Sequence, residues 1–121
     1  MRYTRVYSDP DGETHFEDAE TAGETTRAAE SDLVGTVSET FPVASVYFRE
    51  VVEESSPVPH NAPFPLFIVG LRGTFSIEVS DGELRNFPPG SVVLVTDTEG
   101  KGHTTRRVGN ESRTTLMAPL A

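Results

Sequence analysis

The stretch that decides the fold is "PLFIVGLRGTFSIEVSDGELRNFPPGSVVLVTD", residues 65–97. It opens with an apolar run over 65–73, after which residues 74–80 alternate between apolar and polar side chains. Such alternation is typical of a strand that is buried on one face. The "DG" at 81–82 indicates a two-residue hairpin turn of type I′, and "PPG" at 88–90 marks another turn. The stretch therefore predicts several short strands joined by tight turns.

Further strand-forming segments lie on both sides of this stretch. They cover residues 2–8, 13–20, 41–52, 103–109 and 112–120, and residues 41–52 are rich in β-branched and aromatic side chains. Residues 21–38 carry few large apolar side chains and show no regular period, so we interpret them as a loop or lid. The whole pattern predicts an all-β sandwich or barrel. In this single structural domain, residues 1–40 form an N-terminal arm and residues 41–121 form the barrel.

The composition excludes several classes of function. The chain has 121 residues, a formal net charge of −9 and no cysteine. One domain is expected at this length, and disulfides and thiolate metal sites are excluded. The excess of carboxylates argues against a nucleic-acid-binding surface, which needs clustered Lys and Arg. We see no signal peptide and no apolar run near the roughly 20 residues that span a bilayer, so we expect a cytoplasmic protein with no membrane partner.

Two motifs stand out between residues 54 and 97. One places a histidine ahead of an apolar strand that ends in glycine, and the other is a glycine followed after five residues by Pro-x-Gly and a second apolar strand. The residues concerned are His60 and Gly73 in the first motif, and Gly82, Pro88 and Gly90 in the second. This pattern resembles the two motifs of the cupin family. The resemblance implies a jelly-roll β-barrel, also called a double-stranded β-helix, with little or no helix.

Most of the metal-ligand positions of the cupin motifs are replaced. In metal-binding cupins, two His and one Glu of the first motif and one His of the second point into the barrel. His60 stands at the first of these positions, whereas the other three read Ala62, Leu66 and Val93. One imidazole does not hold a divalent ion against water, so the usual metal site is not expected.

A different set of polar residues is a candidate site. Strand alternation puts Val93 and Asp97 on the same face, and His103 follows across a short Gly-containing loop. We therefore expect His60, Asp97 and His103 to converge at the mouth of the barrel. They form either a metal-free acid–base set, in which Asp97 orients the histidines, or a rebuilt site for Zn, Fe, Mn or Ni with two His and one carboxylate.

Other side chains are candidates for ligand contacts. Leu66 and Val93 would make the pocket apolar, Asn61 and Tyr47 would hydrogen-bond a ligand, and Lys101 would pair with an anionic substrate. Three functions stay open: proton-transfer chemistry on a small polar molecule (isomerisation, dehydration, epimerisation or cyclisation), a metal-dependent oxygenase or zinc lyase, and a non-catalytic small-molecule-binding module. Edge strands and a thin core also predict a homodimer.

Overall fold

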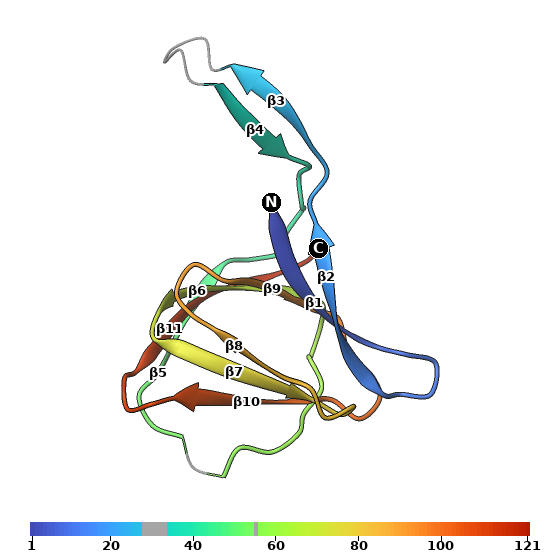
Figure 1. Cartoon of the computed structure of the whole chain (residues 1–121), viewed down its shortest axis with the longest axis vertical. Helices are drawn as coiled ribbons and strands as arrows, with labels where there is room; N and C mark the ends of the chain where they lie inside the picture. The colour runs from blue at the N-terminus through green and yellow to red at the C-terminus, as the bar shows by residue number, and fades with distance from the viewer. Residues whose placement is uncertain (28–33, 55) are drawn as a thin grey trace.

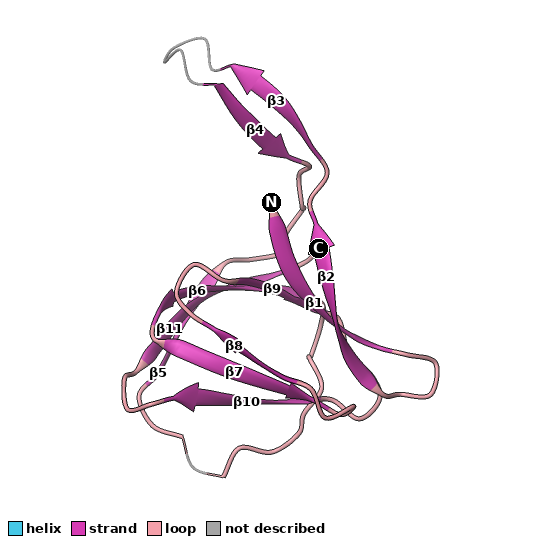
Figure 2. Cartoon of the chain, viewed as in Figure 1, coloured by secondary structure: helices cyan, strands magenta, loops and turns pink. Residues whose placement is uncertain are grey.

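The computed structural model describes residues 1–27, 34–54 and 56–121, and this part of the chain contains strands and no helix. Its strands form a six-stranded sheet, a three-stranded sheet and a two-stranded ribbon (Figures 1 and 2). The prediction of an all-β fold is therefore confirmed. The two larger sheets do not close into one continuous barrel, so the jelly roll stays a prediction. No helix able to cross a membrane occurs in the described part.

The six-stranded sheet carries most of the fold. Its strands, in spatial order, are β2 (Thr14–Glu20), β1 (Arg2–Ser8), β9 (Val92–Val95), β6 (Leu66–Arg72), β11 (Arg113–Pro119) and β5 (Tyr47–Val51). Its neighbouring strands run antiparallel, except that β1 and β9 run parallel. This pairing joins the first hairpin of the chain to the same sheet as the later strands.

The three-stranded sheet contains the hairpin that the "DG" signal predicts. Its strands, in spatial order, are β10 (His103–Val108), β7 (Thr74–Val79) and β8 (Leu84–Phe87). The predicted two-residue type I′ turn is wrong, because Val79 N–H bonds to the Glu83 carbonyl at 3.0 Å and three residues lie between them. A type I′ turn needs two residues with positive φ, whereas here Gly82 alone takes that conformation, at +98°. Asp81 thereby avoids the left-handed region.

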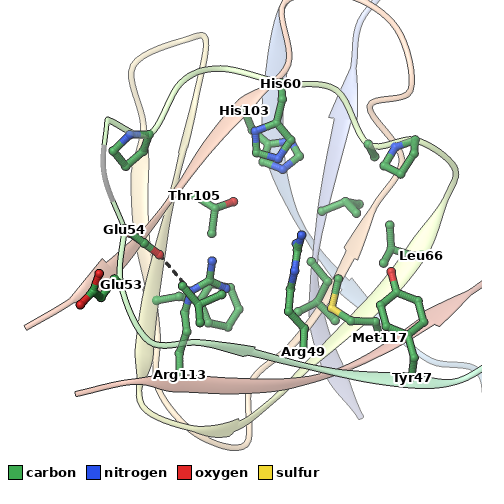
Figure 3. Close-up of a pocket in the computed structure, with 17 residues that line it drawn as sticks. Tyr47, Arg49, Glu53, Glu54, His60, Leu66, His103, Thr105, Arg113 and Met117 are labelled. Carbon is green, nitrogen blue, oxygen red and sulfur yellow. Dashed lines mark hydrogen bonds and ion pairs between the residues drawn. The ribbon is translucent and has the colours of Figure 1, made fainter. Parts of the chain in front are cut away.

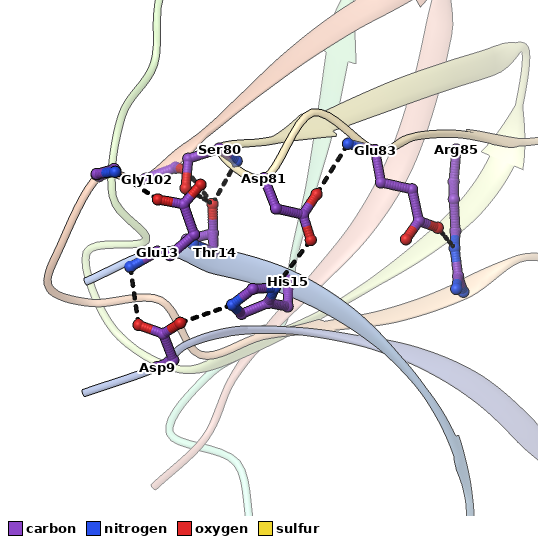
Figure 4. Close-up of polar contacts among 10 residues, drawn as sticks. Asp9, Glu13, Thr14, His15, Ser80, Asp81, Glu83, Arg85 and Gly102 are labelled. Carbon is purple, nitrogen blue, oxygen red and sulfur yellow. Dashed lines mark hydrogen bonds and ion pairs between the residues drawn. The ribbon is translucent and has the colours of Figure 1, made fainter. Parts of the chain in front are cut away.

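The β1–β2 hairpin uses the same kind of turn. Asp9 N–H bonds to the Glu13 carbonyl at 2.9 Å, Gly12 N–H bonds to the Asp9 carbonyl at 3.0 Å, and Gly12 has a φ of +84°. The two turns are joined by His15, as Figure 4 shows. Its Nε2 lies 2.7 Å from Asp9 Oδ2, and its Nδ1 lies 2.8 Å from Asp81 Oδ2. We call these three side chains the His15 clamp.

The third sheet is a ribbon that extends away from the two larger sheets (Figure 1). It consists of β3 (Gly23–Arg27) and β4 (Val34–Ser38), paired antiparallel from Gly23 with Ser38 to Arg27 with Val34. The interpretation of 21–38 as a loop is therefore wrong for both strands, and its residues 28–33 lie outside the described part. All side chains of β4 are exposed. A ribbon of this kind does not need alternating large apolar residues, which explains why the sequence carries no strand signal here.

The hydrophobic core lies between the two larger sheets. The alternation predicted in β7 is present, since Phe75, Ile77 and Val79 are at most 2% exposed. From the facing sheet, Val6 of β1 and the inward residues of β9 pack into the same cluster. Beyond this packed region the space between the sheets widens into a cavity.

Candidate functional site

A cavity of about 500 Å³, partly open to solvent, is lined by strands from both larger sheets and by the loop that precedes β6 (Figure 3). A volume of this size suits a small metabolite. The apolar part of its wall consists chiefly of Leu66, Ile68, Phe75, Val95 and Met117. Its polar groups are gathered on β5, β10, β11 and the loop, so the cavity has one apolar side and one polar side.

Two histidines lie side by side at one end of this cavity. His60 and His103 form an isolated antiparallel bridge, with both N–H···O=C distances at 2.9 Å. Directly opposed residues of such a pair present their side chains on the same side, and the two ring centroids are 4.7 Å apart. Gly102 makes the close approach feasible: its φ is +76°, and a Cβ there would overlap the His60 carbonyl oxygen. The bridge thus fixes the spacing of the imidazoles.

A buried carboxylate holds one of the two rings. Asp97 Oδ2 lies 2.5 Å from His103 Nδ1, and the side chains are 0% and 4% exposed. Nδ1 donates to the carboxylate, which leaves Nε2 as the ring nitrogen without a partner among the described residues. The second carboxylate oxygen, Oδ1, is buried and also lacks a partner in this part of the chain. Asp97 therefore acts on the cavity only through His103.

The loop from Asp97 to Gly102 is tied to the segment that carries His60. Asn61 Nδ2 donates to the carbonyls of Asp97 at 3.2 Å and Gly100 at 3.1 Å, and Ala62 N–H donates to the Asp97 carbonyl at 3.2 Å. Asn61 is a predicted ligand contact, but its amide is used in holding these two segments together and it does not line the cavity.

Two arginines contribute the positive charge of the cavity wall. Arg113 of β11 is 9% exposed, and its Nε lies 3.2 Å from Glu54 Oε1. Burial lowers the pKa of the Arg113 guanidinium, the bond to Glu54 acts in the opposite direction, and the positive charge of Arg49 lowers it further. Arg49 of β5 has neither a hydrogen bond nor an ion pair to any described residue. The wall therefore carries one compensated and one uncompensated cation.

The remaining predicted contacts fall in three places. Tyr47 and Leu66 line the cavity, and their contact with a ligand stays a prediction. Val93 is 0% exposed and lies in the core, outside the cavity lining, because β9 packs that side chain between the sheets. Lys101 is exposed and pairs with Glu13, whose hydrogen bond raises the pKa of the ammonium. Lys101 is thus engaged away from the cavity.

The predicted metal alternative finds little geometric support. Within residues 1–27, 34–54 and 56–121, no group of three or more His, Asp or Glu side chains is arranged to hold a metal ion. The reason is the position of Asp97: its carboxylate faces His103 Nδ1 from behind the ring and does not join the two imidazoles at a common point. Asp97 contacts His103, and the His103 ring lies beside that of His60, a succession of contacts that suits proton transfer better than metal coordination.

Sequence reasoning missed Arg49, Arg113 and Thr105, which all line the cavity. A signal for Arg49 was present. The segment "YFREV" alternates, and Tyr47, Arg49 and Val51 share one face of β5. An arginine on a face shared with apolar residues indicates a polar function inside a pocket, although the acidic run that follows it is typical of a solvated face.

No family model matches the sequence, and neither does any curated protein. The chemistry of the cavity is therefore the guide to function. The cavity offers a ring nitrogen backed by a buried carboxylate, a neighbouring imidazole and a free guanidinium, beside an apolar wall. This set can bind a small molecule of mixed polarity and can exchange a proton with it.

Proposed function

We propose that this chain is a cupin-type protein that binds a small molecule of mixed polarity between its two larger sheets and moves a proton on it. The observation that carries the proposal is the His103–Asp97 pair in the wall of a cavity of about 500 Å³. A histidine with Nδ1 fixed by a carboxylate has its other nitrogen available as a base, and imidazole titrates near neutral pH.

The roles follow from the order of the groups. Asp97 holds the proton on His103 Nδ1 and stabilises the imidazolium that forms when Nε2 accepts a proton from the substrate. His60, whose ring centroid is 4.7 Å from that of His103, is placed to return a proton to the substrate from a neighbouring position. Isomerisation, epimerisation, dehydration and cyclisation all need one group that removes a proton and another that supplies one.

The cupin assignment is supported by the resemblance in sequence together with the arrangement of the sheets. Two facing, largely antiparallel sheets with a cavity between them suit the expected fold. Ala62 and Leu66, which stand at positions of lost metal ligands, both line the cavity. Their apolar side chains favour a ligand over a metal ion at that end.

A non-catalytic binding module is the second candidate function. The apolar side of the cavity, formed by Leu66, Ile68, Phe75 and Met117 among others, favours it because such a surface binds ligand without acting on it. The two candidates differ in a measurable way: both bind a ligand, and only the first exchanges its protons.

The test uses ligand-observed NMR in D₂O with a panel of small sugars, hydroxy acids, keto acids and lactones. Saturation transfer reports binding, and loss of a C–H signal reports proton exchange in the same sample. We expect a ligand whose C–H signal is exchanged by the native protein and is kept with His103→Gln. Binding without exchange by the native protein would favour the binding module, and a panel with no binder would contradict both functions.

A further inference from the structure

We propose that the ligand of this cavity is a small monocarboxylic acid with an apolar body, and that Arg49 binds its carboxylate. This inference rests on the proposed function, since it names the ligand class of the same cavity. It depends on the position of Arg49, on the lack of a described ion-pair partner for its charge and on the apolar residues that the neighbouring strands β6 and β11 add to the cavity wall.

The position of Arg49 follows from strand pairing. β5 is the edge strand of the six-stranded sheet, and Arg49 stands opposite Thr115 of β11. Alternation along both strands turns these residues to the inner side. Figure 3 shows the Arg49 guanidinium extending across the cavity toward the end where His60 and His103 lie. A group bound by Arg49 would therefore sit beside the imidazoles.

Of the two arginines of the wall, Arg113 has a carboxylate partner among the described residues and Arg49 has none. Arg113 is balanced by Glu54, whose Oε1 accepts from its Nε at 3.2 Å and whose Oε2 accepts from Arg107 N–H at 2.5 Å. The Arg113 guanidinium carbon also lies 5.6 Å from the centroid of the Phe75 ring, which occupies its face. Arg113 is thus a built-in part of the wall, and no carboxylate among the described residues balances Arg49.

Arg49 lines the cavity and is also exposed to solvent, so its guanidinium is accessible to a ligand that enters from solution. The chain has 19 Asp and Glu against 10 Lys and Arg, so carboxylates are abundant as partners. Glu53 is near in sequence and borders the cavity, yet Figure 3 shows its carboxylate directed away from Arg49. A guanidinium left open in this way presents a planar fork of donors that matches a carboxylate.

The charge count favours a monoanion. One uncompensated guanidinium balances one negative charge, and the other cation of the wall is already paired. A phosphate monoester carries nearly two charges at neutral pH and would leave one unbalanced beside Glu54 and the buried Asp97. The body of the acid would lie against Leu66, Ile68 and Met117, the apolar residues that β6 and β11 of the same sheet contribute to the cavity.

The test measures Kd by titration calorimetry for matched probes: benzoate and cyclohexanecarboxylate, their primary amides, and phenyl phosphate. The variants are Arg49→Gln, Arg49→Lys and, as a control, Arg72→Gln, whose side chain is 64% exposed and pairs with Glu111 outside the cavity. We expect the acids to bind about tenfold or more tightly than the amides, and Arg49→Gln to remove that difference while Arg72→Gln keeps it. Arg49→Lys should recover part of it, because a lysine keeps the charge but loses the fork.

Each result decides one question. Acids and amides that bind equally well, or Arg49→Gln with unchanged acid affinity, would overturn the role of Arg49 and leave the small-molecule function standing. Tighter binding of phenyl phosphate than of benzoate would overturn the monocarboxylate. No binding by any probe or by the NMR panel would overturn both proposals. Thermal melting of each variant shows that an affinity change is not a folding defect.

Discussion

At the scale of single residues, the proposed chemistry depends on Asp97. Its carboxylate accepts from His103 Nδ1 at 2.5 Å and thereby fixes the tautomer in which Nε2 is unprotonated. In Asp97→Asn, the amide can donate to Nδ1 and so favour the opposite tautomer, which has no base facing the ligand. We expect ligand affinity to stay within a fewfold of native, while proton exchange falls on the order of 10³-fold.

The measurement for Asp97→Asn is the ¹⁵N shift of the two His103 ring nitrogens, recorded together with the exchange rate. If Asp97 has only a structural role, Asp97→Asn should lower stability while His103 keeps its native tautomer, so that the ¹⁵N chemical shifts of Nδ1 and Nε2 do not change places. If exchange of the ligand proton keeps its native rate in this variant, His103 is not the base. The variant Thr105→Val, another cavity residue of similar volume, serves as a control for nonspecific disturbance of the wall.

The candidate site could be predicted only in part. The cupin resemblance pointed to His60, and strand alternation with a short following loop pointed to Asp97 and His103. In the structure, the His103 ring contacts the Asp97 carboxylate and lies beside the His60 ring. Their roles stay predictions. Arg49 and Arg113 were missed because both lie outside the cupin motifs. They come together only through the pairing of β5 with β11, two strands that are far apart in the sequence.

At the scale of elements, the His15 clamp joins the two hairpin turns. The hydrogen bonds to Asp9 and then to Asp81 raise the pKa of the His15 imidazole. The pKa of Asp9 is lowered chiefly by His15, and that of Asp81 is lowered chiefly by the Glu83 backbone N–H. The contribution of the clamp to stability is therefore complete below the ordinary histidine pKa of about 6.5 and above that of aspartate, about 3.9. It is lost as pH rises through the raised His15 pKa.

The prediction is a double-mutant cycle with His15→Gln and Asp81→Asn, measured by urea unfolding. The Asp81→Asn variant keeps a side-chain oxygen as the acceptor for Glu83 N–H, so the cycle isolates the contact between His15 and Asp81. We expect a favourable coupling free energy at about pH 5.5 that falls toward zero at about pH 9. A coupling that is equal at both values would show that the neutral imidazole suffices. Lys101, whose pKa is raised by Glu13, stays charged over this range and does not contribute to the change.

The strands were more predictable than the site residues. How well each strand was predicted depends on whether it buries one face. Segments such as 74–80, which bury one face, carry a period of two, and the structure places β7 there. The position of the turn after β7 was predicted correctly, but its length was not. The sequence "DG" suits both a two-residue type I′ turn and a longer type I turn that ends at Gly82. The side chains of β4 are all exposed, so no alternation of buried and exposed residues marks that strand.

At the scale of the whole molecule, charge decides how stability responds to salt. Carboxylates exceed cationic side chains by nine, and the folded chain holds this charge in a smaller volume than the unfolded one. Raising salt from about 0.02 M to 1 M shortens the Debye length from over 20 Å to 3 Å, which removes more repulsion from the folded chain than from the expanded one. Treating both states as charged spheres gives a stabilisation on the order of 2 kcal/mol. Salt also weakens the exposed ion pairs, but the stability lost there is smaller than this gain, since each pair contributes about 0–1 kcal/mol.

We therefore expect the melting temperature to rise by several degrees between these two KCl concentrations, because about 1 kcal/mol corresponds to roughly 4 °C in a domain of this size. A matched variant, Glu39→Lys with Glu50→Lys and Glu99→Lys, replaces exposed carboxylates and changes the net charge from −9 to −3. It should melt higher than the native chain at low salt and respond less to KCl. A melting temperature that falls with salt in the native chain would mean that ion pairs such as Lys101–Glu13 and Arg113–Glu54 outweigh the repulsion. In that case the three substitutions should bring no gain at low salt, so the two measurements check each other.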